Sequence, residues 1–188
     1  PRVEGGVATV STVHEALRGG CDVAMRRGMA GAGGGPDHRA THVRDDVDTL
    51  IMSPSLFTQR PILDPADLEG DRLLATETRP GDWIDWLEAA KLPHLIGRPR
   101  TLFDHFFITR QAVMDGLGIG IGPLPMLDID IAMGHLVTPF PHIRVQRTGY
   151  VALLPKSTED TEPSTRFVEW LAREGAAGQY QLSEGQAS

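Results

Sequence analysis

Two arginines directly follow a short β-prone segment near the start of the chain. Arg26 and Arg27 come after the run Cys-Asp-Val-Ala-Met at residues 21–25. A guanidinium group at the end of a strand can bind a carboxylate through two parallel hydrogen bonds. The sequence therefore predicts that at least one of this pair binds an anion. The competing interpretation is an arginine that is solvated or that bridges two parts of the fold.

A second polar group lies between a short apolar strand and a helix. Thr76, Glu77 and Thr78 follow the run Arg-Leu-Leu-Ala at residues 72–75. Hydroxyl groups at a strand end near the start of a helix suit the recognition of an anion or an amide. Glu77 suits either an ammonium group or a pairing with an arginine. Loop and capping roles are the competing interpretation for all three.

Glycine occupies every second position from residue 116 to residue 122. A phosphate-binding loop needs a strand, then the glycine turn, then a helix whose amino end faces the phosphates. Here the predicted order is helix, glycine, strand and helix, so Gly116 and Gly118 are expected to end a helix. The strand that follows has Ile119 and Ile121 on one face and glycine on the other. A bare glycine face allows close approach of packed backbone or of a ligand.

Nothing in the sequence points to catalysis or to a metal ion. His38 and His42 are four positions apart, but they lie in or just after a glycine-rich loop, so their spacing is no argument for a metal site. The motifs GxSxG, HExxH and CxxC are absent, and no nucleophile has an evident base. We therefore expect a protein that is not an enzyme and that uses no metal and no cofactor.

Composition excludes several classes of protein. The 188 residues carry a formal net charge of −7, which disfavours nucleic-acid binding through the overall field. The most cationic stretch, residues 97–110, has carboxylates around it. The single cysteine, Cys21, argues for no disulfide. The sequence shows no apolar run of about 18 residues and no signal-peptide pattern, so we expect a cytoplasmic protein without a membrane partner.

Apolar spacing predicts alternating strands and helices. The start of the chain, residues 5–28, is typical of a strand, helix and strand unit with a parallel sheet. Asp82 and Asp104 are the predicted caps of two later helices. The remaining strands are expected within residues 45–55, 72–77, 119–125 and 149–157, and the helices within residues 79–93, 102–118, 126–137 and 163–178.

Six segments in this order resemble the effector-binding domain of LysR-type transcriptional regulators. The similarity covers nearly the whole chain and is strongest to the branch that includes glycine-cleavage activators and β-lactamase regulators. The segments are ALRGGCDVAMRRG (16–28), LIMSPSLFTQRPILDPADLEGDRLLATE (50–77), DWIDWL (82–87), VMDGLGIGIGPLPM (113–126), MGHLVTPF (133–140) and YVALLPKS with FVEWL (150–157 and 167–171).

The resemblance implies an α/β fold of the periplasmic-binding-protein type 2, with two Rossmann-like lobes joined by two crossover strands. Lobe I is expected at residues 1–52 plus 150–180 and lobe II at 53–149, with a frayed tail at 181–188. The resemblance also implies that the helix-turn-helix domain, and the first strand and helix of the effector domain, are absent from this chain. The expected hinge residues are Met52, Ser53, Thr148 and Gly149.

The same resemblance implies a small effector bound between the lobes. Phe103 is at a position where the family often places a cleft side chain, although a core phenylalanine is the competing interpretation. Tyr150 lies at the second crossover, where its hydroxyl can face the ligand, and the glycine-striped strand edges the cleft. The predicted effector contacts are Arg26, Arg27, Thr76, Glu77, Thr78, Phe103, Ile119, Gly120 and Tyr150.

The function implied by the resemblance is ligand sensing in a DNA-binding transcription regulator. Such regulators form antiparallel dimers through their effector domains and tetramers when intact, and they contact promoter DNA through the helix-turn-helix domain. The paired arginines favour an anionic effector. An extracytoplasmic solute-binding protein of a transporter is the alternative with the same fold, and the missing signal peptide disfavours it. An enzyme on this fold is a third hypothesis, without a catalytic constellation to support it.

Overall fold

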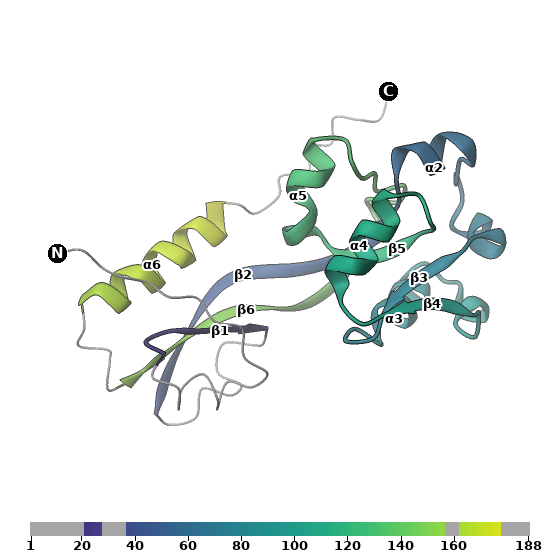
Figure 1. Cartoon of the computed structure of the whole chain (residues 1–188). Coiled ribbons are helices and arrows are strands. Elements are labelled where there is room, and N and C mark those ends of the chain that lie inside the picture. The colour runs from purple at the N-terminus through teal and green to yellow at the C-terminus, as the bar shows by residue number, and fades with distance from the viewer. Residues whose placement is uncertain (1–20, 28–36, 157–161, 178–188) are drawn as a thin grey trace. The chain divides into compact units, whose positions relative to one another are not determined.

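The computed structural model in Figure 1 describes residues 21–27, 37–156 and 162–177. Three predictions fall outside these described residues and stay predictions. They are the strand and helix expected between residues 5 and 20, the glycine loop at 28–36 and the tail at 181–188.

The chain divides into two compact units. Unit 1 comprises residues 1–45 and 148–188, and unit 2 comprises residues 46–147. Strands β2 (His38–Ile51) and β6 (Val145–Pro155) run from one unit into the other. The lobe boundaries expected from the sequence lie after residue 52 and before residue 150. On β2 the structural division falls earlier, because residues 48–51 already pair with a strand of unit 2.

Unit 1 is built on antiparallel strands. Strand β1 (Ala24–Arg27) pairs with β6, so that Ala24 lies opposite Leu153 and Arg27 opposite Tyr150. The order β1-β6-β2-β5 describes the four-stranded sheet, whose last strand belongs to unit 2. Helix α6 (Glu162–Ala177) covers the strands of unit 1 by placing Val168 in one cluster with Val43 and Ala152. A Cβ atom on Gly175 would lie 1.9 Å from the carbonyl oxygen of Val43, so glycine allows this close packing.

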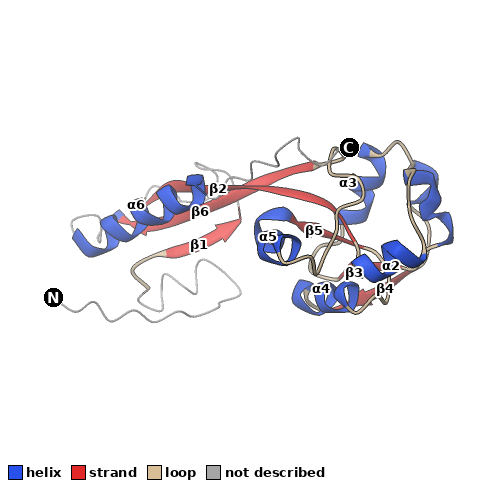
Figure 2. Cartoon of the chain, turned by 90° about the horizontal axis from the view of Figure 1, so that it is seen from above, coloured by secondary structure: helices blue, strands red, loops and turns tan. Residues whose placement is uncertain are grey.

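Unit 2 combines short strands with helices on both of their faces (Figure 2). Strands β3 (Leu73–Thr76) and β4 (Arg100–Phe103) are parallel, with Leu73 opposite Arg100. Strand β5 (Gly120–Pro123) is antiparallel to β2. The helices are α2 (Pro54–Gln59), α3 (Asp82–Ala89), α4 (Phe106–Met114) and α5 (Leu124–Ala132), with 3-10 turns at Pro65–Gly70 and Pro93–Leu95.

Adjacent residues of the central strands serve two different cores. Leu50 and Leu73 belong to a cluster that contains Trp86 of α3, whereas Ile51 and Leu74 belong to a second cluster with helices α4 and α5. This alternation follows from the period of two in a strand, which sends neighbouring side chains to opposite faces. The sheet is therefore covered by α3 on one face and by α4 and α5 on the other.

Each strand and helix predicted within unit 2 has a counterpart in the structure, but the helices predicted at 102–118 and 126–137 span Phe106–Met114 and Leu124–Ala132. The sequence did not predict β4 or α2, and both predicted helix caps are wrong. Gly81 precedes helix α3, and Asp82 is the first residue of the helix, with its carboxylate bound by Arg79. In α4 the cap is His105, without a side-chain hydrogen bond, and not Asp104. None of the described helices has the length and hydropathy that crossing a bilayer requires.

The space beside the alternating glycines of residues 116–122 is occupied by other atoms of the protein. Gly116 has a φ of 76° and ends α4, as the sequence predicts. A Cβ atom on Gly118 would lie 2.4 Å from the carbonyl oxygen of Arg72, and one on Gly122 would lie 2.7 Å from Cζ of Phe106. These contacts leave no space for side chains, so the glycines allow β5 to pack closely between β3 and the helices.

Candidate functional site

The carboxyl ends of β3 and β4 bring three of the predicted effector contacts together. Thr76 lies opposite Phe103 in the parallel register, and the backbone N–H of Glu77 donates to the carbonyl oxygen of Phe103 at 2.8 Å. The Glu77 and Thr78 side chains are exposed, and Phe103 packs partly against the cluster of α4. Polar groups at the carboxyl ends of parallel strands are suitably placed for binding a ligand.

Thr76 is held by a residue that the sequence did not single out. The hydroxyl groups of Thr76 and Thr109 lie 2.8 Å apart, and the two residues are 4 % and 1 % exposed. Thr109 is on α4, and its hydroxyl also lies 3.5 Å from the carbonyl oxygens of Ala75 and His105. No sequence spacing links two residues on a strand and a helix that are 33 positions apart.

Replacing Thr109 by valine is expected to lower the free energy of unfolding by about 1 kcal/mol, because the buried Thr76 hydroxyl loses this partner. Valine has nearly the same volume, so packing changes little. Chemical denaturation of the variant and the parent measures the effect. The matched control is Thr58→Val on α2, where an exposed hydroxyl donates to the carbonyl oxygen of Pro54. Equal losses in the two variants would contradict the prediction.

Ile119 and Gly120 take part in the core. Ile119 is fully buried in the cluster with Trp86, and its backbone N–H donates to the carbonyl oxygen of Arg72 at 2.9 Å. A Cβ atom on Gly120 would lie 2.9 Å from a methyl group of Val113. Both residues therefore contribute to packing, and a contact between either of them and an effector stays a prediction.

Unit 1 brings its predicted contacts into one strand pair. Arg26 lies opposite Val151 and Arg27 opposite Tyr150 in the antiparallel register. These arginines are the last two residues of β1, whereas the sequence placed them after the strand. The Arg26 side chain is half-buried, and Tyr150 packs against the cluster that contains Val168. The effector role of the three residues stays a prediction.

The predicted hinge residues have well-defined places in the backbone. Met52 is buried and exchanges two backbone hydrogen bonds with Val137, at 3.1 and 2.9 Å. The hydroxyl of Ser53 accepts from the backbone N–H of Leu56 and caps α2. Thr148 and Gly149 lie within β6, at and directly after the division between the units. Bending at these four residues stays a prediction.

A buried network of arginines and aspartates lies where β2 and β6 enter unit 2. Asp48 is fully buried and accepts from Nη2 of Arg79 at 2.7 Å and from Nε of Arg147 at 2.6 Å. Arg79 also binds Asp82, and Arg147 binds Asp82 and Asp85. Two cations thus link three carboxylates from β2 and α3. Sequence reasoning missed this network, because its members come from separate elements.

Burial in this network raises the pKa of Asp82 from 3.8 to about 6, an effect that the charge of Asp48 increases and Arg79 and Arg147 oppose. We expect the carboxyl carbon of Asp82 to titrate near pH 6 by NMR. The Asp82 carboxylate of the folded chain then binds a proton more tightly than that of the unfolded chain. Protonation of Asp82 therefore raises the free energy of unfolding as the pH falls through 6 toward 3.8.

Two controls test this assignment. Asp82→Asn removes the titrating carboxyl group. The free energy of unfolding of the parent, minus that of this variant, should therefore rise as the pH is lowered from neutral to about 5. The pKa of the Asp130 carboxyl should be displaced the other way, because hydrogen bonds from Arg110 hold it below 3.8. An Asp82 midpoint near that ordinary value would contradict the prediction.

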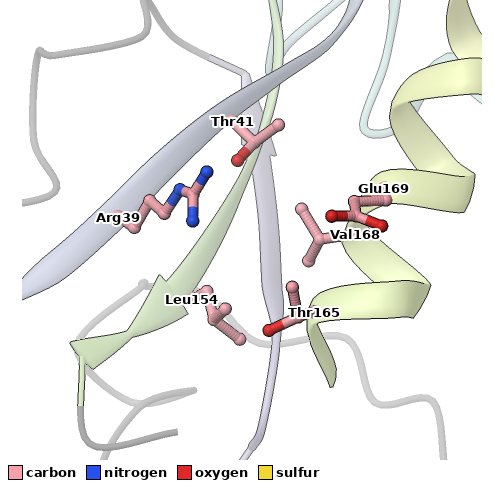
Figure 3. A pocket seen from close by; sticks show the side chains of 6 residues that line it. All are labelled: Arg39, Thr41, Leu154, Thr165, Val168 and Glu169. Carbon is pink, nitrogen blue, oxygen red and sulfur yellow. The ribbon is translucent and has the colours of Figure 1, made fainter. Parts of the chain in front are cut away.

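Unit 1 contains a small cavity between helix α6 and the strands. Its volume is about 50 Å³, enough for ordered water but far below the usual size of a pocket for a small organic ligand. Figure 3 shows the side chains that line it, which are Arg39, Thr41, Leu154, Thr165, Val168 and Glu169. We therefore assign this cavity no effector.

Unit 2 contains a larger cavity of about 380 Å³ beside the ends of β3 and β4. Thr76 and Glu77 contribute to its wall, together with Arg98, Arg100 and Trp83. This volume lies in the range of small-molecule sites. Within the described residues, no group of three or more His, Cys, Asp or Glu side chains is arranged to hold a metal ion.

The sequence pattern of the LysR substrate binding domain family matches residues 1–176. The chain belongs to this family. It is 29 % identical over 178 residues to the HTH-type transcriptional activator AmpR of Rhodobacter capsulatus, and 25 % identical over 180 residues to the glycine cleavage system transcriptional activator of Escherichia coli. These alignments cover 94 % and 95 % of this chain but 58 % of each relative.

Solved structures agree with the family assignment. The effector domain of the transcriptional regulator AmpR of Pseudomonas aeruginosa is 26 % identical, with a TM-score of 0.71 over 86 % of this chain and 75 % of that one. The regulatory domain of CrgA from Neisseria meningitidis, 22 % identical over 88 % of this chain and 80 % of its own, shares the fold with a TM-score of 0.70. The predicted periplasmic-binding-protein type 2-like fold is thereby confirmed for this LysR substrate-binding domain.

The relatives also bear on the hypotheses of function. Both curated relatives of this LysR domain are transcriptional activators, which does not favour the solute-binding protein of a transporter. The resemblance predicted from the six segments is confirmed by the family match. The chain spans little more than half the length of these regulators, so the activity of the whole protein remains a matter for proposal.

Proposed function

We propose that this chain is the effector-sensing part of a LysR-type transcriptional regulator that works in the cytoplasm and is not an enzyme. The observation that carries the proposal is the family match over residues 1–176, combined with curated relatives that are transcriptional activators. The acidic charge of −7 fits a part of the protein that binds a small molecule and does not itself contact DNA.

The proposed ligand is a small anionic molecule. The predicted contacts form one group in each unit, with Arg26, Arg27 and Tyr150 in unit 1 and the remaining residues in unit 2. Their joint role in binding one effector is part of the proposal. In unit 2, Thr76 offers a hydroxyl that Thr109 orients, and Glu77 offers an exposed carboxylate beside it. Arginines suit carboxylate and phosphate groups because the guanidinium can donate two parallel hydrogen bonds.

Effector binding regulates only if it distinguishes two arrangements of the protein. A ligand shifts such an equilibrium by its difference in affinity for the two states, and coupling energies of about 1–3 kcal/mol are typical. We assign promoter contact to a helix-turn-helix segment of the same gene product, since the relative from Rhodobacter is named an HTH-type activator. Antiparallel dimers of the sensing part and tetramers of the intact protein belong to the same proposal.

A metabolite screen tests the sensing role. The chain is mixed with a library of small carboxylates, phosphates and neutral analogues, and its melting temperature is measured. We expect at least one anion to raise it in a concentration-dependent way. Arg26→Gln should weaken that shift, whereas Arg144→Gln, an exposed arginine, should not.

The regulatory role needs a second measurement. The intact gene product should bind DNA from its own promoter region, and the anion found in the screen should change that binding or the extent of transcription. Light scattering of the chain and of the intact protein measures the expected dimer and tetramer. A gene product that binds no promoter DNA, together with a chain that no small molecule stabilises, would overturn the proposed function.

A further inference from the structure

The cavity of about 380 Å³ in unit 2 has a wall that is both cationic and apolar. All of its lining residues come from the single stretch 75–102. On β4, Arg100 and Leu102 are two positions apart and therefore project from the same face of the strand. Arg98 and Arg100 provide charge, and Trp83 and Leu102 provide apolar surface. The whole cavity is thus a feature of one unit.

Of its three arginines, only Arg100 lacks an acidic neighbour among the described residues, because Arg98 interacts with the nearby charge of the Asp71 carboxylate. Arg79, the third, is paired with Asp48 and Asp82. Nη2 of Arg100 donates to the carbonyl oxygen of Ile96 at 2.6 Å, and Arg98 donates to the carbonyl oxygens of Leu68 and Asp71. The Asp71 carboxylate is already bound by Arg60 at 3.1 Å. The positive charge on this wall is therefore only partly balanced.

Arg100 is the less compensated of the two. Its Nε atom is shielded from solvent and has no hydrogen-bond partner among the described residues. Burial lowers the pKa of the Arg100 guanidinium, and no acidic group opposes this effect. A partly desolvated cation beside an open cavity is stabilised by an anion placed there.

The apolar side of the cavity is rigid. The Trp83 indole is 2 % exposed, and its Nε1–H donates to the carbonyl oxygen of Leu74 at 2.7 Å, which holds the ring in place. Leu102 is 59 % exposed although it is a large aliphatic side chain. A ligand with an apolar body would cover Leu102, and the burial of that exposed side chain is favourable. The indole of Trp83 has little accessible surface left and serves as a fixed part of the wall.

We propose that unit 2 binds a small organic oxyanion, a carboxylate or a phosphate, with its charged group at Arg98 and Arg100 and its apolar body against Trp83 and Leu102. This site lies within one unit and shares Thr76 and Glu77 with the proposed effector contacts, so the inference rests on the proposed function in that it gives the unit 2 part of that site a chemical class of ligand. Glu77 lies on the same wall and disfavours ligands with excess negative charge on that side.

Calorimetric titration of the whole chain at low ionic strength tests the site. The probes are 3-phenylpropionate, phenyl phosphate, inorganic phosphate and the uncharged 3-phenylpropan-1-ol. We expect saturable binding of the two aromatic anions, and at least about tenfold weaker binding of the alcohol and of inorganic phosphate. The tighter of the two aromatic anions identifies the carboxylate or the phosphate as the preferred group.

Variants distinguish binding at this site from a general attraction of anions to the positive charges of the protein. Arg100→Gln should weaken binding by about tenfold or more, and Arg144→Gln should not, although Arg144 also donates to a nearby carbonyl oxygen. Leu102→Asp is a second variant that keeps the test valid if Arg100→Gln fails to fold, because Leu102 is exposed. Its added carboxylate should also repel the anion and weaken binding.

The unit 1 variant Arg26→Gln should leave this binding unchanged, which distinguishes the site from the proposed effector contacts in unit 1. Three results would overturn the inference. They are equal binding of the alcohol and the aromatic anions, unchanged binding in both Arg100→Gln and Leu102→Asp, and a loss in Arg26→Gln as large as that in Arg100→Gln. None of these results depends on whether the intact gene product binds promoter DNA.

Discussion

Replacing Asp48 by asparagine is expected to lower the free energy of unfolding by about 3–5 kcal/mol. Asp48 is fully buried and binds both Arg79 and Arg147. The amide keeps the shape of the side chain, but its NH2 group donates and cannot accept from a guanidinium. One arginine therefore loses its buried acceptor, and the two arginines keep only Asp82 and Asp85 as carboxylate partners. Denaturant unfolding of the parent and the variant measures the loss.

The matched control is Asp45→Asn, three positions earlier on β2. The Asp45 side chain is 55 % exposed and lies 3.2 Å from His42, and exposed pairs of this kind contribute about 0–1 kcal/mol. Both variants replace an aspartate by asparagine, and they differ in whether the replaced side chain is buried or exposed. If Asp48→Asn and Asp45→Asn lower the stability equally, the buried network does not stabilise unit 2 more than an exposed ion pair does.

Replacing Gly118 by alanine is expected to cost about 3 kcal/mol, near the upper end for overpacking. A Cβ atom there would lie 2.4 Å from the carbonyl oxygen of Arg72 and 3.0 Å from side-chain atoms of Leu74. A backbone oxygen cannot turn aside as a side chain can, so β5 and β3 would have to separate. This change would also break the hydrogen bond between Leu74 and Ile119, which is 2.8 Å long.

Gly97→Ala is the control for this prediction, because nothing lies within 4 Å of a Cβ atom at that position. We expect its unfolding free energy to stay within about 0.5 kcal/mol of the parent value, as for most surface substitutions. Thermal or denaturant unfolding measures both variants under the same conditions. A Gly118→Ala chain as stable as Gly97→Ala would show that β3 and β5 are not closely packed.

Much of the fold could be predicted because the signals are local. The stripe of Trp83, Trp86 and Leu87 follows helical spacing, and the structure buries all three on α3. The positive φ of Gly116 follows from the glycine after an apolar helix. The helix caps were predicted wrongly, since Asp82 has a stronger partner in Arg79 than the free N–H groups of its own helix.

The candidate site was predicted less completely. The sequence marked Thr76 and Glu77 by their place at a strand end, and the structure puts both on the wall of the cavity in unit 2. It did not mark Arg98 and Arg100, which belong to a stretch of mixed charge. Arg100 begins β4 and Arg98 lies two positions before it, and only the tertiary structure shows that both border a cavity.

The sequence by itself determined the family and the kind of fold, because both can be read from short motifs in a particular order. These motifs are local patterns of glycine, proline and apolar residues. Only the tertiary structure decided which polar side chains are structural and which face a cavity. Asp48 and Arg147 are 99 positions apart, and Thr76 and Thr109 are 33 apart. Such pairs form only when the chain has folded, so their chemistry depends on topology and not on spacing.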